Sequence, residues 1–140
     1  MKKRFQAKVL VAGEAVGEAL LLAEPLSLWG GLNPETGEII DQRHPNVGEI
    51  VTGRVLLMPA GRGSSSASSI LLEAVKQGTA PAAIITAVTD AILALGAAVA
   101  HEMYNQAPPI LVLSAKDYAQ IKSGQQLTIA ADGLVTLSTS

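Results

Sequence analysis

The chain has 140 residues, which is enough to bury one hydrophobic core, and we expect a single domain over residues 1–140. A net charge of −2 excludes the basic field of a nucleic-acid-binding protein, and the lack of cysteine excludes disulfides and thiolate ligation of zinc or an iron–sulfur cluster by this chain. Because 49% of the residues are hydrophobic and only 3% are aromatic, we expect an aliphatic core and some apolar surface that another chain covers.

The first half of the sequence predicts strands and loops. Residues 5–12 and 18–23 are two expected strands, separated by glycines, and Pro25 ends the second. The turn-forming residues between 29 and 37 predict a long loop, followed by a brief pairing at residues 39–40. Residues 49–58 are the expected strand that leads into a segment rich in glycine and serine.

Helices and strands alternate in the middle of the sequence. A helix is expected to run to about Gln77, because Gly78 is placed to stop it. Residues 82–87 form an expected buried strand, after which Thr89 or Asp90 caps a helix that ends near Tyr104.

The last elements complete the expected fold class. Residues 109–113 form a strand, Ser114 opens a short helix that reaches residue 122, and Asp132-Gly133 is a strong hairpin signal. No crossover helix separates the strands before Gly61. The sequence therefore predicts an α/β protein of the layered β/β/α type, with a mostly β framework and about three helices, rather than a doubly wound sheet.

No segment has the pattern of a signal peptide or a membrane span. Charged and polar residues interrupt the apolar stretch that should follow the basic N-terminus of a signal peptide. Residues 80–100 are apolar, but Pro81, Asp90 and Gly96 divide them into a strand and a helix. We therefore expect a cytoplasmic protein that does not bind a membrane.

The most informative segment is Gly61-Arg62-Gly63-Ser64-Ser65-Ser66, between an expected strand and an expected helix. Glycines allow the backbone to approach a ligand closely, and a helix N-terminus favours a carboxylate or phosphate. The guanidinium of Arg62 has a fork geometry that suits the same anions. The pattern therefore predicts an anion site at this strand–helix junction.

Other readings of this segment remain open. The lysine of a phosphate-binding P-loop is missing, which weakens a nucleotide-binding interpretation. A nucleophile elbow would need a histidine further along the chain, and only His101 lies there. The three serines also suit plain capping of the helix. Arg62 can equally be a surface cation paired with Glu73 or Asp90.

Two further residues, His44 and Trp29, each have two possible roles. His44 precedes Pro45 in an extended stretch, where it is either a hydrogen-bonding residue that fixes a loop or a catalytic group. Trp29, the only tryptophan, precedes Gly30-Gly31 and is either a core residue or an interface anchor.

With these elements in place, the sequence resembles the small subunit, or swivel domain, of the aconitase X family. The resemblance covers nearly the whole chain, in order and at sensible spacing. The matching segments are residues 13–15, 17–19, 24–31, 33–41, 44–45, 61–66 and 91–96.

The resemblance implies a swivelling β/β/α fold and a hydro-lyase (dehydratase) that a separate large subunit completes. It implies that Ser64 is the proton acceptor. From the residue types in the same segment we expect Arg62, Gly63, Ser65 and Ser66 to bind a small anionic substrate. The large subunit would carry an iron–sulfur cluster or metal, and this chain would bind no cofactor.

Two substrates are associated with the family, namely cis-3-hydroxy-L-proline and mevalonate 5-phosphate. A charged fraction of 16% does not suggest the ion-pair networks of a hyperthermophile and so favours the bacterial substrate, cis-3-hydroxy-L-proline. The alternatives are mevalonate 5-phosphate as the substrate and a non-enzymatic anion-binding or phosphotransfer swivel module.

Overall fold

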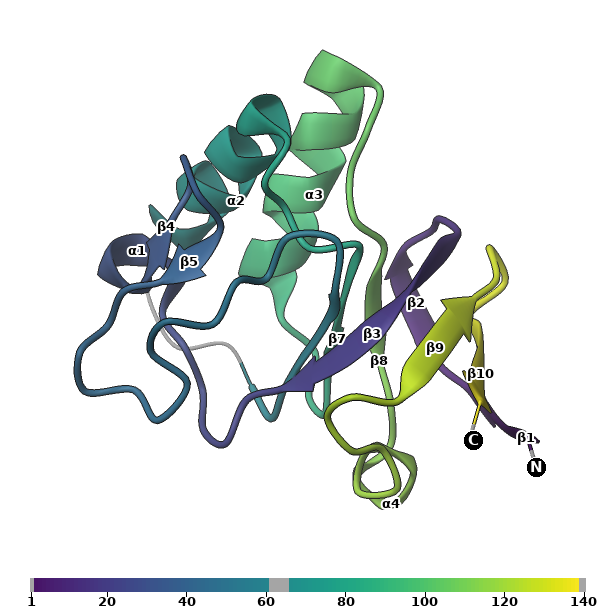
Figure 1. Ribbon diagram of the computed structural model, residues 1–140. Helices are drawn as coiled ribbons and strands as arrows, with labels where there is room; N and C mark the ends of the chain where they lie inside the picture. Colours follow the sequence, from purple (N-terminus) through teal and green to yellow (C-terminus); the bar gives the residue numbers. More distant parts are fainter. Residues whose placement is uncertain (1, 61–65, 139–140) are drawn as a thin grey trace.

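Eight strands form one sheet in the order β1-β10-β9-β3-β6-β7-β8-β2 (Figure 1). The computed structural model describes residues 2–60 and 66–138. Strands β3, β6, β7 and β8 are parallel to one another, whereas β1, β10, β9 and β3 are joined by antiparallel pairs. The eight strands are β1 (Lys2–Gln6), β2 (Lys8–Val11), β3 (Ala15–Leu21), β6 (Val55–Met58), β7 (Ala83–Thr86), β8 (Ile110–Val112), β9 (Gln126–Ile129) and β10 (Leu134–Ser138).

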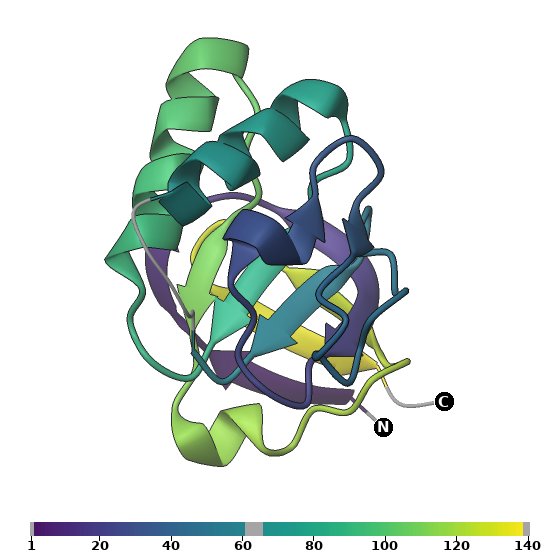
Figure 2. The same ribbon diagram turned by 90° about the vertical axis from the view of Figure 1, so that its left-hand side faces the viewer.

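The sheet is nearly closed into a barrel by the N-terminal segment. Strands β1 and β2 are separated only by Ala7, yet β1 pairs with β10 at one end of the strand order and β2 pairs with β8 at the other. One continuous stretch of chain therefore joins both edges of the sheet. Figure 2 shows the strands curving around an interior, with two long helices along one side.

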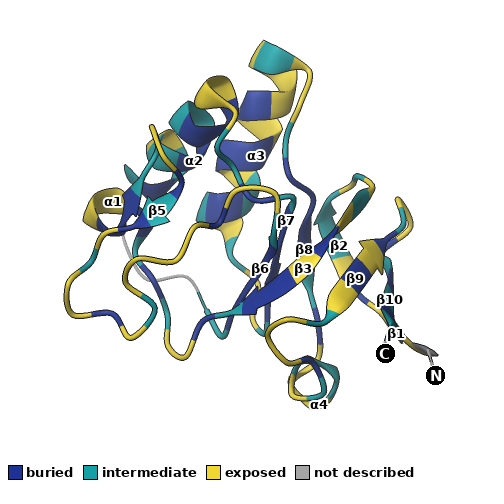
Figure 3. Cartoon of the chain, viewed as in Figure 1, coloured by how far each residue is buried: buried dark blue, intermediate teal, exposed yellow. Residues whose placement is uncertain are grey.

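Strand β6 shows how the chain builds two cores. Its four residues are all buried (Figure 3). In a strand, successive side chains point to opposite faces of the sheet. Leu56 and Met58 belong to the core between the sheet and the helices, and Val55 and Leu57 belong to the core inside the curved sheet. Side chains on both faces of β6 are therefore packed in a hydrophobic core.

The two long helices are the crossovers between parallel strands. Helix α2 (Ser66–Gln77) joins β6 to β7, and helix α3 (Ala91–Tyr104) joins β7 to β8. Both end where the sequence predicts: α2 ends before Gly78, which adopts a positive φ of 78°, and α3 ends before Asn105, which adopts a φ of 56°. Asp90 caps the start of α3, as expected. The expected layered β/β/α class with a mostly β framework is confirmed.

The structure has two single-turn helices besides these, which makes four in the described residues where about three were expected. Helix α4 (Ala115–Tyr118) begins at Ser114 as predicted but is shorter than expected. Helix α1 (Leu28–Gly31) is a kinked turn in which Trp29 and Gly30 have non-helical dihedral angles. Nearby, β4 (Leu32–Asn33) and β5 (Glu38–Ile39) form a small antiparallel pair.

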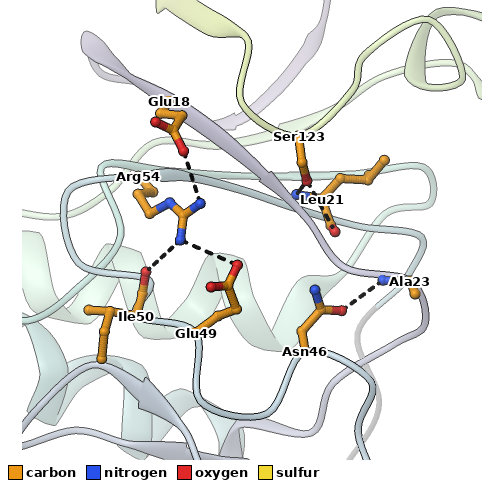
Figure 4. Close-up of polar contacts among 8 residues, drawn as sticks. All are labelled: Glu18, Leu21, Ala23, Asn46, Glu49, Ile50, Arg54 and Ser123. Carbon is orange, nitrogen blue, oxygen red and sulfur yellow. Dashed lines mark hydrogen bonds and ion pairs between the residues drawn. The ribbon is translucent and has the colours of Figure 1, made fainter.

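The expected strand over residues 49–58 is wrong in its first half. Only Val55–Met58 form β6, and Gly53, with a φ of 73°, lies in a turn before it. Arg54 fixes this turn, because its guanidinium contacts the carboxylates of Glu18 at 3.0 Å and Glu49 at 3.6 Å (Figure 4).

No helix within residues 2–60 and 66–138 is both long enough and apolar enough to cross a membrane.

Candidate functional site

The carboxyl ends of the four parallel strands define one edge of the sheet. The described segments that leave this edge are residues 22–27 after β3, 59–60 after β6, 87–90 after β7 and 113–114 after β8. Ligand sites in α/β proteins lie preferentially at this kind of edge. Because α2 and α3 also begin here, the edge brings loops and helix N-termini together.

The predicted site residues fall in the segment between β6 and α2. Arg62, Gly63, Ser64 and Ser65 lie outside the described residues, so their roles stay predictions. Ser66 is the first residue of α2. The strand–helix junction that the sequence predicts for this segment is confirmed by β6 before it and α2 after it.

The segment that follows β7 is hydrogen-bonded to the segment that follows β6. The Ala87 N–H donates to the Pro59 carbonyl at 3.1 Å, so the β6 and β7 segments are tied together. The buried hydroxyl of Thr86 donates to the Val88 carbonyl at 2.6 Å and fixes the turn that follows. Sequence reasoning missed Thr86, because its position in the pattern is that of an ordinary strand residue.

The two helix N-termini at this edge differ in the acidic residues beside them. The Asp90 carboxylate accepts from the backbone N–H groups of Ile92 and Leu93, both at 3.0 Å. An acidic side chain therefore already occupies the positive end of the α3 dipole. Helix α2 has no acidic residue in its first turn, so its positive end is the more suitable one for an external anion.

His44 is bound by the backbone on both ring nitrogens. Its Nδ1 atom accepts from the Asn46 N–H and its Nε2 atom donates to the Glu24 carbonyl, each at 3.0 Å, and the side chain is only 3% exposed. Asn46 Oδ1 in turn accepts from the Ala23 N–H at 3.0 Å (Figure 4). These are the contacts of a residue that fixes the β3–α1 segment, which is the first of the two roles considered for His44.

Trp29 is exposed at the surface of the kinked turn α1. Its exposed fraction is 62%, which excludes a role as a core residue and leaves the interface alternative as a prediction. Gly30 adopts a φ of 78°, a conformation that residues with a side chain rarely adopt. Gly31 is buried, and a Cβ there would lie 2.9 Å from Leu26 Cδ1. The Trp-Gly-Gly sequence thus allows the chain to present the indole outward.

The described residues do not suit a metal or cluster. No group of three or more His, Cys, Asp or Glu side chains comes together anywhere in residues 2–60 and 66–138, and the sequence has no cysteine. Nothing in this part of the chain supplies the thiolates that iron–sulfur clusters require.

Comparison with known proteins shows the family. The family model described as "Aconitase X swivel domain" matches residues 4–137, and the chain belongs to this family. A solved structure, the holo form of Thermococcus kodakaraensis aconitase X, superposes with a TM-score of 0.87 at 29% identity, over 98% of this chain and 99% of the matched one.

Two curated relatives differ greatly in length. The cis-3-hydroxy-L-proline dehydratase of Pseudomonas aeruginosa is 49% identical over 106 residues, which are 76% of this chain but only 18% of that protein. The phosphomevalonate dehydratase small subunit of Archaeoglobus fulgidus is 38% identical over 129 residues, which are 92% of this chain and 93% of that one. The chain thus spans less than a fifth of the first relative and nearly all of the second.

Proposed function

We propose that this chain, as a single swivel domain of residues 1–140, is the small subunit of a hydro-lyase that dehydrates a small β-hydroxy carboxylic acid. The observation that carries the proposal is the end-to-end similarity to the Archaeoglobus small subunit, which covers 93% of that protein. The junction between β6 and α2 supports it, because the predicted anion-binding segment connects the carboxyl end of β6 to the start of α2.

The substrate that we propose is cis-3-hydroxy-L-proline. The identity of 49% to the Pseudomonas dehydratase supports this choice. Mevalonate 5-phosphate is the second candidate, because the relative that matches this chain along nearly its whole length acts, by its name, on phosphomevalonate. Both compounds are hydroxy acids that carry at least one anionic group.

We assign the proton transfer to Ser64. Its Oγ would accept the proton from the carbon next to the substrate carboxylate, the carbon–carbon double bond would form, and the hydroxyl on the neighbouring carbon would leave as water after protonation. Arg62 would bind the carboxylate, and Gly63, Ser65 and Ser66 would complete the pocket wall on this side.

This chain alone cannot activate a serine as a base. The helix dipole contributes about 0.3–2 kcal/mol, whereas each unit of pKa requires about 1.36 kcal/mol, and a serine alkoxide lies several units above neutrality. The large subunit must add desolvation and positive charge, or a water must share the proton transfer. We therefore place the iron–sulfur cluster or metal of the enzyme in the large subunit.

A phosphotransfer module is the non-enzymatic alternative, and it would need an accessible histidine near the anion site. His44 already uses both ring nitrogens in backbone hydrogen bonds. His101 is exposed but lies ten residues into α3, about 15 Å along the helix axis from the end that faces the site. These placements favour the hydro-lyase.

The test is turnover of both candidate substrates by the chain combined with its large subunit. Mass spectrometry should show the loss of one water from cis-3-hydroxy-L-proline by the complex and no reaction with the isolated chain. Turnover of mevalonate 5-phosphate alone would change the substrate assignment. Turnover by the isolated chain would contradict the two-chain proposal.

A further inference from the structure

Two exposed apolar side chains follow the strands that lie on either side of β6 in the sheet. Trp29 is 62% exposed and lies in the stretch that follows β3, and Val88 is 52% exposed and lies in the turn that follows β7. In the sheet β6 lies between β3 and β7, so Trp29 and Val88 follow the two strands that flank β6. Trp29 lies on α1, which packs against α2, the helix that follows β6.

The backbone that carries each of these side chains is held by a hydrogen bond within its own turn. The Val88 carbonyl accepts from the Thr86 hydroxyl, and the Trp29 carbonyl accepts from the Ser27 hydroxyl at 3.2 Å. Leu28, next to Trp29, is buried, and α1 packs against α2. An apolar side chain on a fixed backbone loses little freedom when a partner covers it, which favours its use as an anchor.

We propose that Trp29 and Val88 anchor the large subunit of the dehydratase over the carboxyl edge of the parallel strands; this inference rests on the proposed function. The Pseudomonas relative identifies the kind of occupant, because this domain makes up only 18% of a chain whose remainder is joined to it. A site whose proton acceptor is in this chain, and whose metal is not, needs that remainder against this edge to exclude water. A second copy of this chain seated there would instead block the partner.

The outer face of α3 offers a matched control. Met103 is 59% exposed, close to the value for Trp29, but it lies twelve residues into α3, about 18 Å along the axis from the carboxyl edge. A groove of about 100 Å³ lies between α2 and α3 and is lined by residues that include Leu72, Leu95 and Val99. If this face bound the large subunit instead, truncation of Met103 would weaken the complex.

The experiment measures the affinity of the full chain for the purified large subunit. Trp29 is the only tryptophan, so 5-fluorotryptophan labelling gives a single ¹⁹F resonance that reports on this place. We expect the resonance to shift when unlabelled large subunit is added, and not when the concentration of the labelled chain alone is raised. Calorimetric titration of the variants should give a Kd about 30-fold higher for Trp29→Ala, a smaller rise for Val88→Ser, and a Kd within about twofold of wild type for Met103→Ala.

The outcomes distinguish a failure of the proposed anchor from a failure of the proposed function. If the wild-type chain binds the large subunit but Trp29→Ala and Val88→Ser bind equally well, the anchor is wrong and the proposed function stands. Equal weakening by Met103→Ala would move the interface to α3, and a shift on self-association would identify a second copy as the occupant. If the wild-type chain binds no large subunit, the proposed function fails together with the inference. Thermal melting of each variant checks that the exposed substitutions leave the fold intact.

Discussion

Replacement of His44 with alanine removes two hydrogen bonds from the segment that leads to Trp29. The Asn46 N–H and the Glu24 carbonyl would both lose their partner in a place where the histidine itself is only 3% exposed. A buried polar group left unpaired costs about 1–3 kcal/mol. Because water can enter part of the vacated space, we take about 1–2 kcal/mol for each group, and we expect His44→Ala to lower the free energy of unfolding by about 2–4 kcal/mol.

The assay is urea and thermal unfolding of the isolated chain, followed by circular dichroism. For a domain of this size, the expected loss corresponds to a fall in Tm of roughly 8–16 °C. His101→Ala is the matched control, because His101 is the other histidine and its side chain is exposed on α3. It should change stability by no more than about 0.5 kcal/mol. A His44→Ala chain as stable as wild type, with only kcat reduced in the complex, would refute the loop-fixing role and favour the catalytic one.

Substitutions at three other positions test separate parts of the account. The Tyr118 hydroxyl is buried with no hydrogen-bond partner among the described residues, and its burial raises the pKa of the phenol. Tyr118→Phe should therefore leave the free energy of unfolding unchanged in urea, or raise it by about 1 kcal/mol. A clear loss of stability would show that the hydroxyl has a hydrogen-bond partner. A Cβ at Gly96 would lie 3.0 Å from backbone atoms of Ser68, so Gly96→Ala should separate α2 from α3 and cost about 1–3 kcal/mol, and an unchanged Tm would contradict this close packing. Arg62→Ala should raise KM by the loss of a contact of about 1.5–3 kcal/mol, and Arg62→Lys should recover part of it; wild-type KM in both would return Arg62 to a surface cation.

Local signals predicted the parts of the fold that local physics decides. Helix α3 is predicted well: Asp90 caps its first turn and the helix ends at Tyr104, both as expected. The hairpin between β9 and β10 follows from Asp132-Gly133, where Gly133 has a φ of 91°. In each case the residues that determine the structure lie within a few positions of one another.

The errors arise where distant contacts decide. Val51 is apolar and fully buried, as in a strand, but it is buried by the packing of a turn against the rest of the domain. The division of the first strand at Ala7 depends on β10 and β8, which lie more than a hundred residues further along the chain. No local pattern reports such pairings, so the near closure of the sheet could not be foreseen.

The candidate site divides in the same way. The Gly–Ser segment is visible in the sequence because its residue types have direct chemical meaning. Thr86 and Asn46 are not, since the hydroxyl of the first and the amide of the second matter only through bonds to Val88 and Ala23 that the fold creates. Residues that bind or react can thus be predicted from type and spacing, whereas residues that position them emerge only with the structure.

The central claim is that Ser64 accepts the proton, and the kcat of Ser64→Ala in the complex with the large subunit tests it most directly. Ser65→Ala and Ser66→Ala are the matched controls, because these serines share the segment and carry the same hydroxyl. We predict that Ser64→Ala assembles normally and loses about 10²–10⁴ in kcat with cis-3-hydroxy-L-proline, whereas both controls keep a kcat near that of wild type and show their contribution to substrate binding in KM alone. A Ser64→Ala enzyme with near-normal kcat, or one no worse than Ser65→Ala, would contradict the account.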